Sequence, residues 1–542
     1  MFLAVYFIFV IYNIPIVAKV PAFTVVRIQK SSITTPGHAG ITFPYGHLLA
    51  WRSRGGDAGH GTTKRPPNCV YVRLRTRLSV VNRLAVPIVL SFCLLLAACG
   101  EQAQLAEGEG MGSNPTLPAP TSTLIPTINI ATATGWPTGA KPESAPDTVV
   151  TAFATGLDHP RWLHVLPNGD VLVAETNAPS RPEEGKGVKG WFMQRAQKNA
   201  GAAVPSANRI TLLRDTNGDG VAETKTVFLH GLNSPFGMAL IGNDLYVANT
   251  DAVMRFPYTE GQTEITAAGM KVADLPAGPL NHHWTKNIIA SQDGKHLYAT
   301  VGSNSNVAEN GMEKEENRAA ILEIDLSTGK WRVFASGLRN PNGLAWHPQT
   351  GALWTVVNER DELGSDLVPD YLTTVKDSAF YGWPYSYYGQ HIDERVKPQR
   401  PDLVAKAVVP DYALGSHTAS LGLAYSGGTA LPETLRDGVF IGQHGSWNRK
   451  PRSGYKVIFV PFANGVPGGK AVDILTGFIS KNDEAQGRPV GVAIDRAGGL
   501  LVADDVGNTI WRVTSANSRQ AHLHACNGGE AKTSGLHSRN DE

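Results

Sequence analysis

The densest group of side chains suited to chemistry is the segment QHGSWNRK, which runs from Gln443 to Lys450. The imidazole of His444 can act as a base near neutral pH. Arg449 and Lys450 can hold a carboxylate, and the indole of Trp447 can stack on a planar ring. The alternative is a surface loop whose charges face water. The composition favours a site that binds a flat, anionic molecule beside a base.

Two further segments carry a histidine or an arginine at a similar place before an apolar run. Adjacent histidines point in different directions, so in HHWTK we expect one of His282 and His283 to face a site. The alternative is one structural and one exposed histidine. In GLRNP, the proline fixes the turn and presents Arg339 at its edge. Both segments therefore supply candidate site residues.

Acidic and amide side chains are gathered in two loops. In NERDE, the residues Asn358, Glu359 and Asp361 offer the hard oxygen ligands that Ca²⁺ prefers, although a solvated acidic turn has the same composition. The segment DTNGDG from Asp215 resembles the opening of an EF-hand loop, but its twelfth position is Thr226 rather than glutamate. The second segment favours a hairpin tip, with a weak calcium site as the alternative.

These segments lie within a pattern that recurs six times between about Gly156 and Val513: a polar loop, an apolar run, a tight turn and a second apolar run. The copies start roughly 50 to 80 residues apart, as the four-stranded blades of a propeller do. Their turns (PNGD, IGND, QDGK, PQTG, DRAGG) carry the Gly, Asn and Asp that tight hairpins need. The sequence therefore predicts an all-β, six-bladed β-propeller.

The repeat also predicts where the polar residues meet. If one strand runs inward from the polar loop and the next runs back, the loop and the end of the second strand share one rim. The loop residues expected there are His159, Arg161, His282, His283, Arg339, Asn340, His417 and Arg488. The expected strand-end residues are Glu175, Asn249, Ser303, Asn358, Glu359, His444, Asp504 and Asp505. For each of them, the alternative is a structural role in satisfying loop amides.

Composition narrows the function. The chain is 42% hydrophobic and 18% charged with a net charge of +2, which gives no sign of a nucleic-acid partner or a polybasic membrane surface. No GxGxxG or P-loop lies between a strand and a helix, and no GxSxG elbow precedes a helix. A redox enzyme of this kind needs a cofactor that a propeller mouth can hold, and a carboxylated quinone fits a cationic rim.

The ends of the chain read as targeting and tether segments. Four arginines precede an apolar run that ends in LAAC at Cys99, which looks like a bacterial lipobox. We therefore expect residues 1–99 to be a targeting region, in which residues 1 to about 70 are mistranslated upstream sequence. Residues 100–147, rich in Pro, Thr and Ala, are expected to form a flexible linker, and 515–542 a polar tail. The propeller is assigned to 148–514. This predicts a periplasmic or extracytoplasmic protein that is held on the membrane only by a lipid at Cys99.

The motifs resemble those of a known family. GLRNPNGLAW from Gly337, followed by FYGWPYSYYG from Phe380, is similar to the glucose/sorbosone dehydrogenases, six-bladed quinoproteins that use pyrroloquinoline quinone (PQQ) and Ca²⁺. HGSWNRKPRSGYKV from His444 resembles the sorbosone and fungal pyranose dehydrogenase branch. The resemblance extends from about Val149 to Thr514.

The resemblance implies roles for matching residues. His283 matches the catalytic base of soluble glucose dehydrogenases, and Arg339 and Asn340 match contacts to the quinone. Arg488 matches one of two arginines that hold the PQQ carboxylates, while Val490 stands in place of the second. The expected cofactor-binding residues are Arg161, Arg339, Asn340, Trp447, Asn448, Arg449, Lys450 and Arg488.

Two departures bear on the choice of base. Ser303 stands where those enzymes have the aspartate that orients the histidine, and Glu359-Arg360 replaces the Gly-Pro pair whose carbonyls bind Ca²⁺. His444 lies at the quinone in the pyranose-dehydrogenase-like branch. We therefore favour His444 over His283 as the base, with Arg339 as a further catalytic residue.

The sequence thus predicts a PQQ- and Ca²⁺-dependent dehydrogenase that oxidises an aldose or an aldehyde-bearing sugar such as a sorbosone. Its electrons would pass to a quinone or a cytochrome. One alternative is a Ca²⁺-dependent hydrolase of the lactonase type, for which the rim carries more cations than such a site needs. The other is a non-catalytic sugar-binding propeller.

Overall fold

The computed structural model describes residues 101–106, 108–121, 127–179, 195 and 197–517. All of them belong to one unit of the chain, Leu78–Glu542. The predicted targeting region with Cys99, and the tail beyond residue 517, lie outside the described residues. No helix among the described residues is long and apolar enough to cross a membrane.

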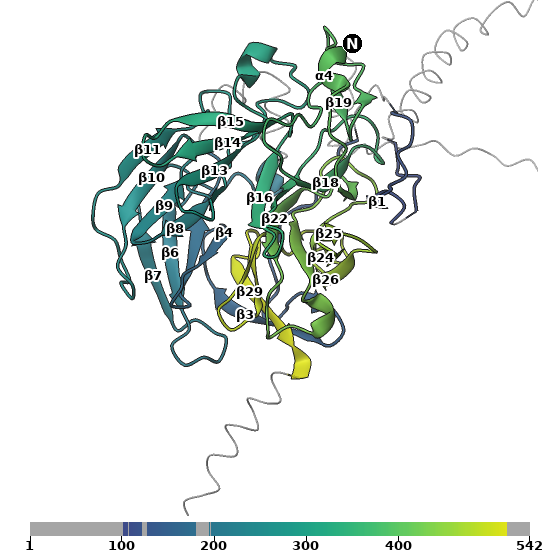
Figure 1. Cartoon of the computed structure of the whole chain (residues 1–542). Helices are drawn as coiled ribbons and strands as arrows, with labels where there is room; N and C mark the ends of the chain where they lie inside the picture. Colours follow the sequence, from purple (N-terminus) through teal and green to yellow (C-terminus); the bar gives the residue numbers. More distant parts are fainter. Residues whose placement is uncertain (1–100, 107, 122–126, 180–194, 196, 518–542) are drawn as a thin grey trace, which may run out of the picture. The chain divides into compact units, whose positions relative to one another are not determined.

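Six antiparallel sheets follow one another along the chain and confirm the predicted six-bladed, all-β propeller (Figure 1). The first blade comprises β4 (Pro160–Val165), β5 (Val171–Glu175), β6 (Arg209–Arg214) and β7 (Thr224–Leu229). The second comprises β8 (Met238–Ile241), β9 (Asp244–Ala248), β10 (Ala252–Pro257) and β11 (Met270–Asp274). The third comprises β12 (Ile288–Ala290), β13 (His296–Val301), β14 (Ala320–Asp325) and β15 (Trp331–Ser336).

The remaining three blades incorporate strands from the N-terminal part of the described chain. The fourth comprises β16 (Pro341–Trp346), β17 (Leu353–Val357), β18 (Pro369–Thr374), β21 (Tyr412–Ser416) and the short outer strand β1 (Met111–Gly112). The fifth comprises β22 (Ser420–Tyr425), β23 (Gly438–Gln443), β24 (Lys456–Ala463), β26 (Val472–Thr476) and β2 (Glu143–Ser144), and β25 (Val466–Pro467) pairs with β24. The sixth comprises β27 (Pro489–Ile494), β28 (Leu500–Asp504), β29 (Thr509–Ser515) and β3 (Thr148–Thr155).

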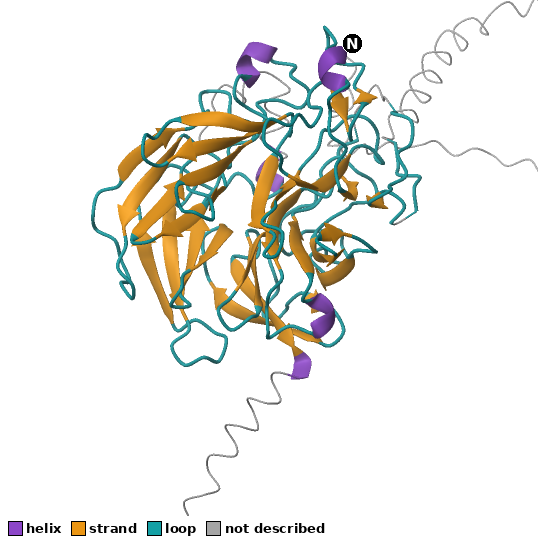
Figure 2. Ribbon diagram, viewed as in Figure 1, coloured by secondary structure: helices purple, strands orange, loops and turns teal. Residues whose placement is uncertain are grey.

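Regular structure outside the blades is sparse (Figure 2). It includes the hairpin of β19 (Ser386–Tyr387) and β20 (His391–Ile392), the helix α4 (Pro401–Val404), and the 3₁₀ turns η1 (Met312–Glu315) and η2 (Glu433–Leu435).

Pairing between the two ends of the domain closes the ring. In the sixth blade, β3 lies antiparallel to β29, with Thr155 opposite Thr509 and Thr148 opposite Ser515. The inner strands β4, β8, β12, β16, β22 and β27 each contact the next, and β27 contacts β4. Such closure protects strand edges that would otherwise be exposed for pairing with another chain.

The core lies between neighbouring blades. The strands β5, β17 and β28 are buried along their whole length, which explains their near-continuous apolar runs. Aromatic side chains fill the first two interfaces, where the ring centroids of Trp162 and Phe236 are 4.7 Å apart and those of Phe236 and Trp284 are 6.2 Å apart. The blades are thereby held rigidly enough to position side chains at their edges.

Strand register brings the polar loops and strand ends to one edge, as the repeat predicts. Pro160 lies opposite Glu175, Pro341 opposite Val357, and Pro489 opposite Asp504. The residues just before each inner strand are therefore neighbours of the residues just after the second strand. We call this edge of the blades the polar rim.

Candidate functional site

The centre of the polar rim is a histidine–carboxylate pair that joins two blades. His444 follows β23 and Asp505 follows β28, and the Nε2–Oδ2 distance is 2.8 Å. Burial lowers the pKa of His444, and Asp505 offsets only part of this effect. Burial by itself would raise the pKa of Asp505, but His444, His159 and Arg161 hold it well below its usual range. A neutral imidazole therefore donates from Nε2 to an ionised carboxylate, which leaves the basic lone pair on Nδ1.

Two residues of the first blade complete this cluster. Arg161 Nη1 lies 2.8 Å from Asp505 Oδ2, and His159 Nε2 lies 3.5 Å from the same oxygen. Burial lowers the pKa of His159 to about 4, so this ring is also neutral at pH 7. Arg161 Nε and Asp505 Oδ1 are buried atoms for which the described residues provide no hydrogen-bond partner. Buried polar atoms without a hydrogen-bond partner are uncommon in protein interiors, and they mark a place where a ligand can bind.

A buried guanidinium lies beside the cluster. Arg488 is 1% exposed, and its Nη2 reaches the Ala131 carbonyl at 3.4 Å and the Tyr455 hydroxyl at 3.3 Å. Its Cζ lies 5.2 Å from the Tyr455 ring centroid and 5.8 Å from that of Trp447. Within the described structure, neither Nε nor Nη1 has a hydrogen-bond partner. A buried charge left this way costs free energy unless an anion is bound to it.

The second candidate base has a different orienting group. His283 Nδ1 lies 2.8 Å from the Ser303 carbonyl oxygen and 3.1 Å from its hydroxyl. A proton on Nδ1 can donate to that carbonyl, which places the basic lone pair on Nε2. Gly302 has no room for a Cβ between His283 and Asn340, whose Oδ1 is buried without a partner among the described residues. His283 therefore lies at the rim with its Nδ1 directed at Ser303.

Arg339 is held by the protein itself. Its Nη1 donates to the Glu359 carbonyl at 2.7 Å, and its Nη2 lies 3.0 Å from Asn306 Oδ1. Asp361 Oδ1 lies 2.9 Å from His417 Nδ1, while His417 Nε2 lies 2.9 Å from the Gly364 carbonyl. Burial would lower the pKa of His417, but Asp361 raises it above its ordinary value. Because both ring nitrogens face acceptors, His417 is an imidazolium, and Arg339 and His417 together form a cationic wall.

The residues predicted to bind calcium instead contact cations of the protein. Glu359 Oε2 accepts from Arg360 Nε at 2.9 Å, and Arg360 has no exposure to solvent. The Asn358 carbonyl oxygen lies 3.4 Å from Arg339 Nη1, and Asp361 is paired with His417. Since protein cations already balance Glu359 and Asp361, these two carboxylates do not fit a Ca²⁺ ion as its ligands.

One cluster of carboxylates with metal-ligand geometry occurs among the described residues, and it lies elsewhere. It consists of Asp215, Asp219 and Glu223 in the turn between β6 and β7. The predicted hairpin tip is therefore confirmed. Its oxygens accept from the backbone of the same loop, as Asp215 does from Gly218 and Gly220.

The side chains of the segment QHGSWNRK lie in two different environments. Trp447 lies by Arg488, and the Asn448 side chain donates to Asp361. Arg449, in contrast, donates to the Ser365 carbonyl at 3.0 Å and lies 3.5 Å from Asp366 Oδ1, while the Lys450 side chain is exposed. Arg161 and Arg488, which the sequence also named as cofactor-binding candidates, lie beside His444 and Trp447, whereas Arg449 is directed to Ser365 and Asp366.

Residues 127–136, which we call the strap, lie against the polar rim. Asn129 donates from its main chain to the Trp447 carbonyl at 2.7 Å and from Nδ2 to the Arg449 carbonyl at 2.9 Å. The main chain at Ala133 forms a parallel bridge with Ala485. Trp136 Nε1 donates to Asp504 Oδ2 at 2.7 Å. These contacts differ from the flexible linker that the composition favours, because the apolar and amide side chains of the strap find partners in blades five and six.

We expect Trp136→Phe to lower the free energy of unfolding by about 1–2 kcal/mol, because it removes a donor to a buried carboxylate while keeping an aromatic ring. Burial raises the pKa of Asp504 to about 6, although Trp136 and Trp511 donate to it. Denaturant unfolding measures the change. Trp331→Phe is the matched control, since its Nε1 donates to the Asp274 carbonyl in an exposed setting. An equal loss in both variants would contradict a specific role for the strap.

Sequence reasoning missed the pairing of Asp505 with His444. The repeat places Asp505 at a strand end on the rim, but no motif connects it with a residue 61 positions away. It also missed the strap, whose composition resembles that of a linker. The available signal was the recurrence of carboxylates after the second strand of several blades.

The fold and the rim define a class of protein: a six-bladed propeller with a histidine–carboxylate pair and buried arginines at one edge. The chain belongs to the TrAA12-like family, whose model matches residues 142–374 and 395–516. It is 23% identical over 351 residues to a pyrroloquinoline quinone-dependent pyranose dehydrogenase of Coprinopsis cinerea, covering 56% of this chain and 43% of that protein. An uncharacterised protein of Borreliella burgdorferi is 27% identical over 292 residues, covering 52% of this chain and 76% of the relative.

Two solved structures share the fold. The holo form of the PQQ domain of that pyranose dehydrogenase superposes with a TM-score of 0.56 at 19% identity, covering 71% of this chain and 100% of the domain. A calcium structure of the Trichoderma reesei family AA12 enzyme gives a TM-score of 0.56 at 18% identity, covering 69% of this chain and 97% of the other.

Proposed function

We propose that this protein is a PQQ-dependent dehydrogenase that oxidises an aldose or an aldehyde-bearing sugar. The observation that carries the proposal is the buried guanidinium of Arg488, two of whose nitrogens lack hydrogen-bond partners among the described residues. A multiply carboxylated planar molecule would satisfy those nitrogens and stack on Trp447. Membership of the TrAA12-like family and the pyranose dehydrogenase relative support the same cofactor.

The residues of the rim have distinct tasks in this proposal. Arg488, Arg161 and Trp447 would hold the cofactor, with Asn340 beside it. When bound, PQQ would supply the hydride acceptor that oxidation of the sugar carbon requires. His444 takes the proton of the sugar hydroxyl on Nδ1, and Asp505 orients the ring and stabilises the imidazolium that forms. Arg339, fixed by Glu359 and Asn306, contributes a stationary positive charge.

The proposal does not place Ca²⁺ at the predicted residues, because Glu359 and Asp361 are already paired with protein cations. The same pairing disfavours a metal-dependent lactonase, whose carboxylates would have to face a metal. Transfer of electrons to a quinone or cytochrome, and attachment to a membrane through Cys99, are further parts of the proposal.

Calorimetric titration of the purified protein with PQQ, with and without Ca²⁺, tests the cofactor. We expect binding in EDTA as well as in Ca²⁺, and dye reduction with a panel of aldoses and sugar aldehydes only after PQQ is added. Absence of PQQ binding under both conditions would contradict the cofactor assignment. Binding without turnover of any sugar would contradict the substrate class, and PQQ-independent lactone hydrolysis would favour the hydrolase.

A further inference from the structure

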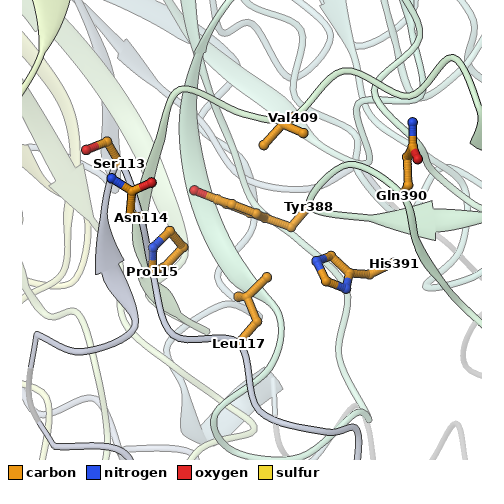
Figure 3. A pocket seen from close by; sticks show the side chains of 8 residues that line it. All are labelled: Ser113, Asn114, Pro115, Leu117, Tyr388, Gln390, His391 and Val409. Atoms are coloured by element: carbon orange, nitrogen blue, oxygen red, sulfur yellow. The ribbon is translucent and has the colours of Figure 1, made fainter.

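A pocket that shares no residue with the polar rim lies on the outer side of the fourth blade. One wall is the segment 113–117 that follows β1, and the other is the β19–β20 hairpin together with Val409 (Figure 3). Its volume is about 520 Å³, in the range of small-molecule sites. The residues that line it are Ser113, Asn114, Pro115, Leu117, Tyr388, Gln390, His391 and Val409.

The lining combines neutral polar groups with an aliphatic surface. Hydroxyl, amide and imidazole groups come from Ser113, Asn114, Gln390 and His391, and no carboxylate or permanent cation occurs among the lining residues. Val409 is 60% exposed, and Leu117 and Pro115 lie on the opposite wall. A charged ligand would find no counter-ion here. A neutral molecule with hydroxyl edges and an apolar C–H face matches both kinds of surface.

The Tyr388 hydroxyl is the polar group that most clearly needs a ligand. Tyr388 is 5% exposed, and its buried hydroxyl has no hydrogen-bond partner among the described residues. In Figure 3 it points across the pocket toward Ser113 and Asn114. Burial raises the pKa of Tyr388 well above its ordinary value, so it is a neutral donor. Leaving such a group unsatisfied destabilises the protein, and an acceptor on a ligand would offset that cost.

Specific contacts hold both walls in place. β1 pairs with β21, with Met111 opposite Leu414, which anchors the strand before Ser113. On the other wall, Gln390 Nε2 donates to the Ala405 carbonyl at 3.1 Å, and Gly389 is too close to Val409 to accept a Cβ. A further contact holds the hairpin, because Arg360 Nη2 donates to the Ser386 carbonyl at 2.7 Å. The pocket is therefore a built feature of the fold.

Most of the pocket lies outside the residues matched by the family model. The family match leaves out everything before residue 142 and the stretch 375–394. Seven of the eight lining residues fall in those two segments, and Val409 is the exception.

We propose that this pocket binds a neutral saccharide unit, as a second carbohydrate site separate from the polar rim. The preference for a saccharide over other neutral polyols rests on the proposed function. Within the pocket, the sugar ring packs its C–H face on Val409 and Leu117 and accepts a hydrogen bond from Tyr388.

The test uses the full chain without PQQ, titrated with cellobiose and with maltose by calorimetry and saturation-transfer NMR. We expect weak binding of at least one disaccharide. Tyr388→Phe removes a single hydroxyl and should weaken binding by about 3- to 10-fold without loss of thermal stability. Val409→Asp should abolish binding, because it places a charge in the pocket. Val466→Asp is the matched control, since Val466 is 56% exposed on β25 and should leave binding unchanged.

The outcomes separate this site from the proposed enzyme. Absence of binding by the wild-type chain, or equal affinity in the wild type, Tyr388→Phe and Val409→Asp, would overturn the proposal. Binding that persists in His444→Ala, together with unchanged PQQ-dependent kcat in Val409→Asp, would support a separate site. If PQQ-dependent turnover fails but Val409→Asp still abolishes binding, the saccharide site stands and the dehydrogenase proposal falls.

Discussion

His444→Ala is expected to lower kcat by about 100- to 10,000-fold, while PQQ binding changes little. General-base catalysis contributes about this factor, and alanine removes the Nδ1 atom that takes the proton. The Nε2 of His444 is committed to Asp505 at 2.8 Å, so the ring has one orientation and one basic nitrogen. Steady-state dye reduction measures kcat, and calorimetry measures PQQ affinity.

The pH profile gives a second measurement of the same assignment. Burial lowers the pKa of His444 from its ordinary value of 6.5, and the base must be neutral to act. We therefore expect kcat to rise with pH through a value below 6.5 and to be constant at pH 7. Asp505→Asn removes the negative charge that raises the pKa of His444. It should therefore move the acid limb of the kcat profile to lower pH and also reduce kcat.

His283→Ala is the matched comparison, because His283 lies at the same rim with a carbonyl rather than a carboxylate on Nδ1. We expect a smaller loss of kcat from His283→Ala than from His444→Ala. The reverse order would assign the base to His283, with Ser303 as its orienting group.

Arg488→Met is expected to raise the Kd for PQQ by about 10- to 100-fold, because one charge-assisted hydrogen bond is worth about 1.5–3 kcal/mol. The free energy of unfolding of the apoprotein should stay the same or rise. The reason is that Arg488 is 1% exposed and has two nitrogens without partners among the described residues, so in the absence of an anion its charge is costly. Calorimetry and denaturant unfolding measure the two effects.

Arg496→Met provides the control for this substitution, since Arg496 is exposed on the turn after β27 and donates to the Asn168 carbonyl at 3.1 Å. We expect no change in PQQ affinity for this variant. A fall in apoprotein stability in Arg488→Met with unchanged PQQ affinity would make Arg488 a structural residue and leave the cofactor without its principal cation.

The fold was predictable because its signals are local. The turns at Asn168-Gly169 and Gly242-Asn243 follow from residues that tolerate the required backbone angles, and each turn joins two short apolar runs. Six such units in order leave few arrangements other than a closed propeller. The register then brings the polar loops and strand ends together, as Pro489 opposite Asp504 illustrates.

The partners of the site residues were harder to predict, because they depend on contacts between blades. Arg449 looked equivalent to a cofactor-binding cation, yet the loop at Ser365 and Asp366 provides its acceptors. Glu359 looked like a metal ligand, yet the adjacent Arg360 folds back onto its carboxylate. Which acceptor a guanidinium reaches is decided by packing, and neighbouring sequence does not carry that information.

The sequence by itself determined the six-bladed architecture and the edge at which His444, His283, Arg339 and Arg488 lie, because turn chemistry and strand periodicity act over a few residues. Only the tertiary structure decided that Asp505 orients His444, that the strap lies on the rim, and that Tyr388 faces a separate pocket. The physical reason is that each of these depends on ring closure and on segments distant in the chain, as with Asn129 and Arg449, 320 residues apart. Loops of variable length separate the blades, so the positions of such partners cannot be calculated from spacing.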